Sequence, residues 1–248
     1  MHNIILVTGA SRGIGASTAI HLASMGYAVV INYCTQRESA QQVATLIGDQ
    51  GGTAWTFQAD VSQATEVDNL FRYIQSLSGQ LVGLVNNAGR LQPQMQLVDM
   101  PNERVLRTLQ DNLMSQFYCC QAAIKIMSTH YNGAGGAIVN VSSAAARLGA
   151  PNEYIDYAMA KGAVDTLTVG LAKETASQGI RVNGVRPGVI DTQMHADGGE
   201  PQRLQRIAPS VPLQRGGQPD EVAKAIGWLI SVQASYTTGS FIEVTGGR

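Results

Sequence analysis

Tyr157 and Lys161 lie four residues apart in the stretch YAMAK, and both side chains carry groups that can exchange a proton. On a helix this spacing puts the two side chains on one face, one turn from each other. A phenol with a pKa near ~10 is a poor acid or base at neutral pH unless a nearby cation stabilises the phenolate. The pair therefore predicts a proton-transferring Tyr157 whose pKa is lowered by Lys161. From these two residues alone, a surface pair without chemistry is the alternative.

A serine hydroxyl suited to assist such a tyrosine stands at the end of the apolar run AIVNVSS, residues 137–143. Ser143 occupies the carboxyl end of this predicted strand, where sites form in open parallel sheets. Its hydroxyl is placed to orient a substrate carbonyl or alkoxide, with Ser142 as the alternative. Tyr154 does not form a second tyrosine–lysine pair, because the residue four positions after it is Ala158.

A glycine-rich turn, TGASRGIG at 8–15, follows the apolar run at 4–7. In open α/β sheets the first strand-to-helix turn is the usual phosphate site, because free N–H groups and the helix dipole favour negative charge. Glycine is placed where the backbone needs an unusual conformation or a close approach. The spacing of Gly9, Gly13 and Gly15 differs from the common dinucleotide fingerprint. For this segment alone, a tight turn without a ligand is the alternative.

The serine, tyrosine, lysine and glycine turn must be positioned by regular elements of the fold. Seven apolar, β-branched runs recur along the chain, at 4–9, 28–33, 53–60, 81–89, 137–143, 180–188 and 240–247. Helical patterns lie between them, for example at 16–26 and 65–77. This alternation is typical of a mostly parallel sheet with helices on both faces. We therefore predict an α/β fold, a single-domain, doubly wound Rossmann-type sheet over residues 1–248. The longest interruption, 191–221, predicts a flexible loop over a site.

Charge and cysteine content narrow the class of protein. The chain has 17 Lys and Arg against 18 Asp and Glu without a basic block, which argues against nucleic-acid binding. Its three cysteines, Cys34, Cys119 and Cys120, lack metal-ligand spacing, so we predict no metal site and a reducing compartment. No segment approaches the ~20 apolar residues of a membrane span, and the first strand leaves no room for a signal peptide. A cytoplasmic protein without membrane contact is expected.

Five motifs follow one another in the order found in the short-chain dehydrogenase/reductase family: TGASRGIG, NNAG at 86–89, Ser143, the pair Tyr157 and Lys161, and RPG at 186–188. The match covers essentially the whole chain and resembles the glucose 1-dehydrogenase-like and 3-oxoacyl-acyl-carrier-protein reductase-like branches. The resemblance implies an NAD(P)-dependent oxidoreductase that interconverts a carbonyl and a secondary alcohol by hydride transfer. It also implies a cofactor half near 1–135 and a catalytic and substrate half near 136–248. A non-catalytic, dinucleotide-binding regulator or sensor is the alternative.

The resemblance assigns four catalytic residues. Tyr157 would be the general acid or base, and Lys161 would also hold the nicotinamide ribose. Ser143 would orient the substrate oxygen, and Asn112 would support a proton relay to Lys161. Ser143 precedes Tyr157 by one position more than is usual in the family, which one inserted residue explains. Further residues are assigned to the cofactor together with Tyr157 and Lys161: Gly9, Ser11, Arg12, Gly13, Ile14, Gly15, Tyr33, Asp60, Val61, Asn86, Asn87, Ala88, Gly89, Pro187, Gly188, Ile190 and Thr192.

The end of the second predicted strand bears on which dinucleotide is bound. NAD enzymes place an acid there for the ribose 2′-hydroxyl, and Tyr33 stands at that position. Arg12 is placed as in NADP-preferring relatives to pair with a 2′-phosphate. Such relatives often carry a basic residue where this chain has Cys34, and Arg37 is the nearest substitute. NADP(H) is therefore the expected cofactor, with some tolerance of NAD(H).

The last predicted helix and strand bear on assembly. The stretches EVAKAIGWLIS at 221–231 and FIEVTGG at 241–247 predict an apolar outer face on the final layer of the sheet. Relatives use this layer to form tetramers with two-fold symmetry. We therefore expect a homotetramer that acts on a small-molecule carbonyl or alcohol.

Overall fold

The computed structural model describes residues 2–248, which build one seven-stranded sheet in which every neighbouring pair of strands is parallel. The strand order is β3-β2-β1-β4-β5-β6-β7. All seven predicted strands are present, which confirms the predicted α/β fold. They are β1 (His2–Val7), β2 (Ala28–Tyr33), β3 (Ala54–Gln58), β4 (Gly79–Asn86), β5 (Gly136–Val141), β6 (Ile180–Pro187) and β7 (Phe241–Val244).

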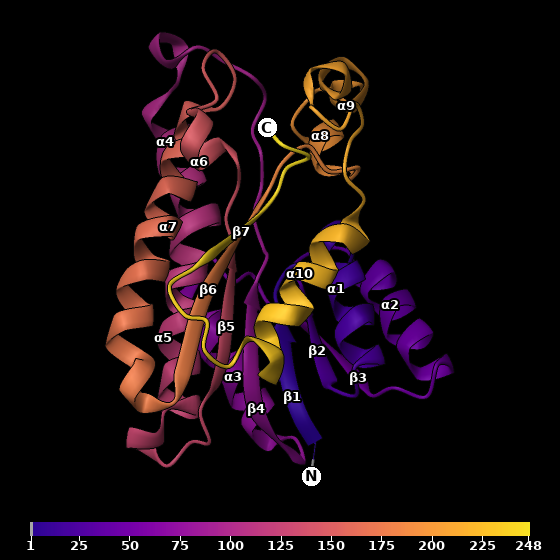
Figure 1. Ribbon diagram of the computed structural model, residues 1–248, viewed down its shortest axis with the longest axis vertical. Helices are drawn as coiled ribbons and strands as arrows, with labels where there is room; N and C mark the ends of the chain where they lie inside the picture. Colours follow the sequence, from indigo (N-terminus) through magenta and orange to yellow (C-terminus); the bar gives the residue numbers. More distant parts are fainter. Residues whose placement is uncertain (1) are drawn as a thin grey trace.

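Helices cover both faces of this sheet (Figure 1). One face carries α1 (Gly13–Ser24), α2 (Arg37–Asp49) and α10 (Pro219–Ile230), and the other carries α3 (Ala64–Ser76), α4 (Asn102–Leu109), α5 (Ser115–Met127) and α7 (Ile155–Thr175). The strands at the centre of the sheet are largely apolar because both of their faces are buried, whereas the edge strands β3 and β7 are partly exposed. In β1, Ile5 and Val7 belong to the core on the α1 side, whereas Ile4 and Leu6 belong to the core on the α3 side.

The glycine turn joins β1 to α1 and starts the helix earlier than its predicted first residue, 16. Gly9 and Gly13 have positive φ angles of 60° and 56°, in a region that favours glycine. Arg12 is the N-cap residue with extended backbone, so α1 already begins at Gly13. The helix predicted at 65–77 is α3, shifted by one residue at each end.

A π-helical turn, η2 (Gln110–Met114), joins α4 to α5. The sequence pattern gave no sign of this turn. A π turn contains one residue more than an α turn and is frequent at functional sites. Asn112 lies inside it and is fully buried.

The segment 191–221, which was predicted to be a flexible loop over a site, includes several short helices. It contains α8 (Met194–Asp197), α9 (Arg203–Ile207), the 3₁₀ turn η5 (Ala208–Ser210) and the start of α10. Within this segment Ile207 and Val211 are buried, and Arg203 and Arg206 form ion pairs. Other short elements are η1 (Leu97–Asp99), η3 (Thr129–Tyr131), α6 (Ala145–Leu148), η4 (Ala176–Gln178) and η6 (Val232–Ala234).

The three cysteines are free thiols. Cys119 and Cys120 are buried, and burial raises the pKa of both, to about 12 for Cys120. Cys34 differs, because it is only partly buried and lies beside the pocket described below. Nowhere in residues 2–248 do three His, Cys, Asp or Glu side chains gather as metal ligands would. Over the same residues, every helix is too short or too polar to span a bilayer.

Candidate active site

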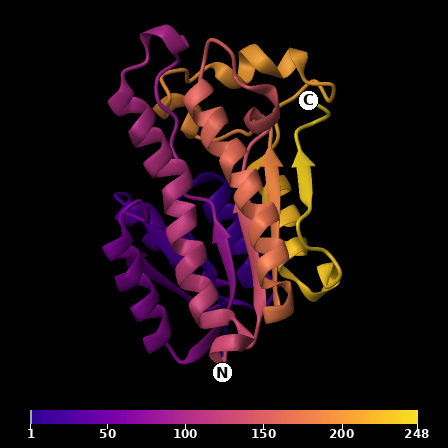
Figure 2. The ribbon, with the colours of Figure 1, turned by 90° about the vertical axis from the view of Figure 1, so that its left-hand side faces the viewer.

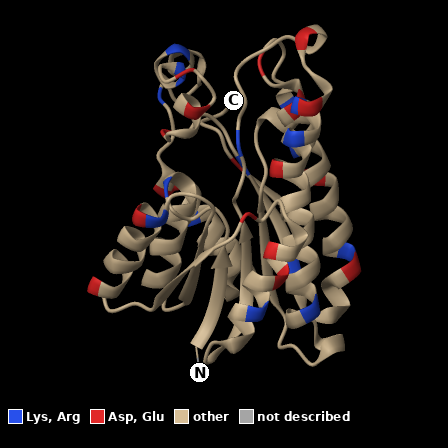
Figure 3. Cartoon of the chain, turned by 180° about the vertical axis from the view of Figure 1, so that it is seen from behind, with Lys and Arg blue, Asp and Glu red and all other residues tan. Residues whose placement is uncertain are grey.

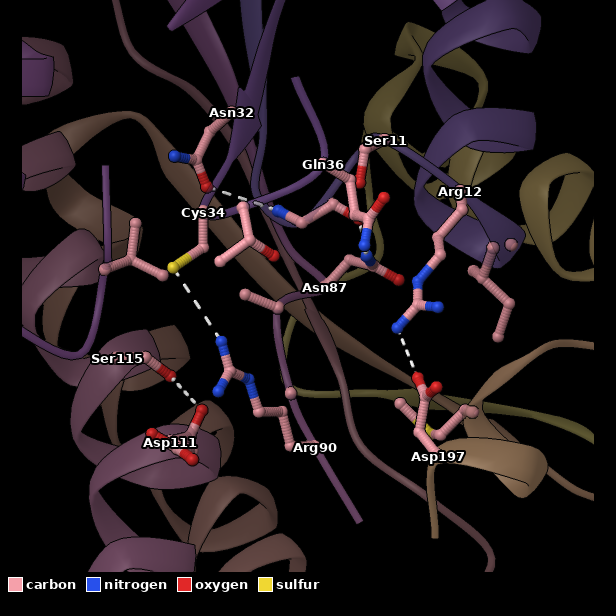
Figure 4. A pocket seen from close by; sticks show the side chains of 18 of the residues that line it. Ser11, Arg12, Asn32, Cys34, Gln36, Asn87, Arg90, Asp111, Ser115 and Asp197 are labelled. Atoms are coloured by element: carbon pink, nitrogen blue, oxygen red, sulfur yellow. Dashed lines mark hydrogen bonds and ion pairs between the residues drawn. The ribbon is translucent and has the colours of Figure 1, made fainter. Parts of the chain in front are cut away.

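A pocket of about 480 Å³ opens beyond the carboxyl ends of β1, β2, β3 and β4 (Figure 4). β1 lies between β2 and β4, so the chain changes direction across the sheet at this point, which is where open α/β sheets bind ligands. Many of the residues predicted to contact a cofactor line this pocket, namely Gly9, Ser11, Arg12, Gly13, Ile14, Asp60, Val61, Asn87, Ala88, Gly89 and Thr192.

The glycine turn leaves no room for side chains on its pocket side. A Cβ atom on Gly9 would lie 2.9 Å from Ala88 Cα, and one on Gly13 would lie 3.3 Å from Thr192 Cγ2. The side chain of Arg12, the N-cap residue, does not cap the first turn of α1. The turn thus offers backbone N–H groups at a helix N-terminus, which fits the pyrophosphate of a dinucleotide.

Gly15 and Asn87 stabilise the glycine turn, and Asn86 stabilises the sheet. A Cβ atom on Gly15 would lie 2.4 Å from the Gly9 carbonyl oxygen, so glycine is required for close packing here. Asn87 Nδ2 donates to the carbonyl oxygens of Thr8 and Gly9 at 2.9 and 3.0 Å. Asn86 is buried and donates to Asn140 Oδ1 at 2.9 Å, away from the pocket lining. Asn86 was predicted to contact the cofactor, but in the structure its side chain contacts Asn140 inside the sheet.

Tyr33 also lies elsewhere than predicted. Its side chain is buried in the core on the α1 side, with Ala40 and Val43 of α2, and is not part of the pocket lining. Side chains alternate between the two faces of a strand, so the neighbouring residues Asn32 and Cys34 line the pocket instead. The end of β2 lies at the pocket, as predicted, but the side chain of Tyr33 faces the core.

Arg12 reaches across the mouth of the pocket to α8. Its guanidinium forms an ion pair with Asp197, and its Nη1 donates to Gln193 Oε1 at 3.0 Å (Figure 4). Both charged side chains are more than two-fifths exposed. An ion pair this exposed contributes at most about 1 kcal/mol, so a stronger anion can displace Asp197.

The second group of predicted residues lies beside this pocket, at the end of β5 and on α7. The hydroxyl of Ser143 lies beside the phenol of Tyr157 and acts to lower its pKa. Ser142 is buried and turned away, since its hydroxyl donates to Asp165 Oδ1 at 2.6 Å. Of the two serines, Ser143 is therefore the one beside the tyrosine.

The electrostatics of Tyr157 differ from the sequence prediction. Burial raises its pKa to about 12, and the hydrogen bond with Ser143 only partly opposes this rise. Burial lowers the pKa of Lys161 to about 8, against the opposing charge of Asp165. The ammonium group of Lys161 lies 5.6 Å from the Tyr157 ring centroid and donates to the Val141 carbonyl oxygen at 2.8 Å. In this arrangement the effect of burial on the pKa of Tyr157 is the larger one, and the lowering of this pKa by Lys161 remains a prediction.

Asn112 fixes the segment that follows NNAG. Its Oδ1 accepts the N–H of Arg90 at 2.9 Å, and its Nδ2 donates to the carbonyl oxygens of Arg90 and Thr108 at 3.0 and 2.9 Å. These bonds occupy both N–H groups of the side-chain amide. Asn112 therefore positions the main chain at the base of the pocket.

Gly89 lies between the pocket and the group formed by Ser143, Tyr157 and Lys161. A Cβ atom on Gly89 would lie 2.7 Å from Asn112 Oδ1 and 3.7 Å from Lys161 Nζ. Pro187, Gly188 and Ile190 follow or end β6 and are not part of the pocket lining. Within residues 2–248 no acceptor is found for the N–H of Ile190.

Three segments that lie above the sheet, at 91–100, 144–155 and 191–212, are tied together by ion pairs and a hydrogen bond. Arg203 and Arg206 of α9 both bind Glu153, which precedes α7, at 2.6 and 2.9 Å. Both also bind Glu200, whose pKa Arg206 lowers to about 2, and Glu200 accepts a hydrogen bond from Gln94. Figure 3 shows acidic and basic residues together in the segments above the sheet. These contacts could not be predicted from the sequence, because the segments are far apart along the chain.

Comparison with known proteins agrees with this geometry. The structure combines a doubly wound parallel sheet, a glycine-rich turn suited to phosphate, and a Ser–Tyr–Lys group. This combination defines a class of nucleotide-dependent oxidoreductases. The family model described as enoyl-(acyl carrier protein) reductase matches residues 9–248. The chain belongs to the short-chain dehydrogenase/reductase family of NAD(P)-dependent oxidoreductases.

Three relatives show how far the similarity extends. The uncharacterized oxidoreductase YgfF of Escherichia coli K12 is 53% identical over 245 residues, which cover 99% of each chain. The 3-oxoacyl-[acyl-carrier-protein] reductase FabG of Staphylococcus aureus is 38% identical over 98% of this chain and 96% of its own. The 3-oxoacyl-[acyl-carrier-protein] reductase of Synechocystis is 39% identical with the same coverage.

Proposed function

We propose that this protein interconverts a carbonyl and a secondary alcohol on a small molecule, with NADP(H) as its preferred cofactor. The observation that carries the proposal is the grouping of Ser143 beside the phenol of Tyr157, with the buried Lys161 one helical turn along α7 and 5.6 Å from the tyrosine ring. Gly89 joins this group to the dinucleotide-type pocket. The nicotinamide, when bound, supplies or accepts the hydride.

Tyr157 is the proton donor in the reductive direction. With a pKa of about 12 the phenol keeps its proton at neutral pH and is ready to give it to a carbonyl oxygen. Ser143 holds the phenol and orients the same oxygen. Lys161 has two further N–H donors besides the one bound to Val141, and these suit the hydroxyls of a ribose. Asn112 supports the proton relay by holding the main chain beside Lys161.

The cofactor is held by backbone groups at the turn and by the ends of the neighbouring strands. The N–H groups of Gly13, Ile14 and Gly15 suit a pyrophosphate. Asp60, Val61, Ala88 and the second asparagine of NNAG suit the adenosine part. By resemblance Pro187, Gly188, Ile190 and Thr192 serve the nicotinamide, for which the free N–H of Ile190 is a suitable donor.

The preference for NADP(H) rests on the end of β2. The residues that line the pocket there are Asn32, Cys34, Thr35 and Gln36, none of which is a carboxylate that would repel a 2′-phosphate. Arg12 lines the same pocket. Tyr33 is left out of this proposal because its side chain is in the core.

A homotetramer in the cytoplasm is proposed on two grounds. The three free thiols suit a reducing compartment. β7 is an edge strand, paired only with β6 and visible at the side of the sheet in Figure 2, and Phe241 and Ile242 are partly exposed. The apolar face predicted for α10 is largely used inside the molecule, against α1 and the sheet, but Trp228 and Val232 remain exposed. Light scattering should give about four times the protomer mass of 26.3 kDa; a monomer contradicts this part.

A panel of carbonyl compounds with NADPH tests the activity itself. We expect oxidation of NADPH, followed by absorbance near ~340 nm, with at least one carbonyl class and none with Tyr157→Phe. Acyl thioesters belong in the panel because of the relatives' names, and sugars belong in it because of the resemblance to the glucose 1-dehydrogenase-like branch. Binding of NADPH without turnover of any compound in either direction would contradict the proposal.

A further inference from the structure

Arg90 follows NNAG directly, and its side chain crosses the pocket toward the end of β2. Its Nη2 lies 3.7 Å from Cys34 Sγ, and both residues line the pocket. Figure 4 shows Arg90 and Arg12 approaching the pocket from opposite sides. The guanidinium of Arg90 thus occupies the strand end where dinucleotide enzymes distinguish the 2′ substituent of the adenosine ribose.

Arg90 differs from Arg12 in having no carboxylate partner within residues 2–248, whereas Arg12 is paired with Asp197. Two carboxylates that line the pocket have other partners. Asp111 binds Arg107 at 3.0 Å, and Asp60 Oδ1 accepts the N–H of Ser62 at 3.0 Å. Arg90 therefore presents a positive charge to the pocket that no ion pair neutralises.

The main chain of Arg90 is fixed, so its side chain starts from a defined place. The fully buried side chain of Asn112 accepts the N–H of Arg90 and donates to its carbonyl oxygen. A binding group whose backbone is already ordered loses less entropy when it meets a ligand. Arg37, the basic residue nearest to Cys34 in the sequence, is exposed at the start of α2 and does not line the pocket.

We propose that Arg90 is a specificity-determining residue that binds the 2′-phosphate of NADP(H) from the β4 side of the pocket, opposite Arg12. It replaces the basic residue that is missing at Cys34. A guanidinium pairs with a phosphate through two parallel hydrogen bonds, but gains little from the neutral 2′-hydroxyl of NAD(H). The inference rests on the proposed function, because it assumes that the pocket binds the adenosine part of a dinucleotide.

Binding titrations without substrate test this role. NADPH and NADH are titrated into the wild type, Arg90→Ala, Arg90→Lys and Arg37→Ala, with Kd followed by calorimetry at low and high salt. We expect Arg90→Ala to weaken NADPH by about tenfold or more and NADH by less than about twofold. Arg90→Lys should recover part of the loss, because it restores the charge without the bidentate geometry. Arg37→Ala should leave both affinities unchanged.

Salt gives a second readout. Removing a cation that contacts phosphate should make the affinity for NADPH less dependent on salt, and the affinity for NADH should keep its salt dependence. Three results would overturn the inference: equal weakening of both dinucleotides by Arg90→Ala, no weakening of either, or a selective loss in Arg37→Ala instead. Failure of the proposed function is a different result, namely a wild type that binds neither dinucleotide.

Discussion

The Nζ atom of Lys161 lies 5.6 Å from the centroid of the Tyr157 ring and is hydrogen-bonded to the carbonyl oxygen of Val141. The lysine and the tyrosine are therefore neighbours on one face of α7, where Lys161 is buried and Tyr157 is partly exposed. Burial favours the neutral form of each side chain. It therefore raises the pKa of Tyr157 and lowers the pKa of Lys161.

Tyr157→Phe should abolish turnover while the affinity for NADPH changes little. The ring and its packing remain, but the transferable proton is lost, which typically costs about 10²–10⁴-fold in rate. Steady-state kinetics and a binding titration of the same preparation measure the two effects. A variant that keeps more than about a tenth of the wild-type rate would remove Tyr157 from the proposed mechanism.

Ser143→Ala and Ser142→Ala should have different consequences. Ser143 contacts the phenol of Tyr157, so its loss should lower kcat/KM by about 10²-fold with little effect on folding. Ser142 is bonded to Asp165, so its loss should lower the free energy of unfolding by about 1–3 kcal/mol and affect kcat/KM much less. Denaturant unfolding and initial rates decide between them. The opposite order would move the catalytic role to Ser142.

The pKa of Lys161 makes stability depend on pH. The native pKa of about 8 lies below the unfolded value near ~10.4. Below pH ~8 both states bind the proton, so the full penalty of burying the charge is present. Between pH ~8 and ~10.4 the native state releases the proton while the unfolded state keeps it, so this group's contribution to stability rises with pH.

Lys161→Met isolates this effect, because it removes the titrating group and keeps a long side chain. The free energy of unfolding of the wild type minus that of the variant should increase by about 2 kcal/mol from pH ~7.5 to ~9.5. Urea unfolding of both proteins at the two pH values measures it. A difference that does not change with pH would show that the buried amine does not titrate in this range.

Arg12→Ala and Asp197→Asn should shift the affinity for NADPH in opposite directions. Arg12→Ala removes a cation proposed to meet the 2′-phosphate and should weaken NADPH about tenfold or more. Asp197→Asn removes the carboxylate that holds Arg12 and should tighten NADPH by about two- to fivefold. NADH should change by less than about twofold in both variants. If wild type binds NADH more tightly and neither change alters NADPH, the proposed role of Arg12 is wrong.

The fold was predictable because each strand carries its own apolar, β-branched signal and neither face of the sheet is open to water. The phosphate turn was predictable for a similar reason, since Gly9 and Gly13 are required by local backbone geometry. Side-chain direction was harder, as Tyr33 shows, because one step along a strand reverses the face. Arg90 and Asp197 were missed because they approach the pocket from segments distant from β2 in sequence. The effect of Asp165 on Lys161 could have been predicted from the sequence, because Asp165 lies one helical turn after Lys161.

The π turn at Gln110–Met114 limits how the chain length can change around Asn112. Each residue of an α-helix advances about 100° around the axis. Deleting one residue here would restore a regular α-helix, but it would rotate α4 relative to α5 by about that angle. Asn112 would then turn away from the main chain of Arg90, or Cys119 and Cys120 would turn out of the core. In this helix a single-residue deletion is therefore more harmful than most substitutions, and natural variants should keep its length while changing its exposed residues.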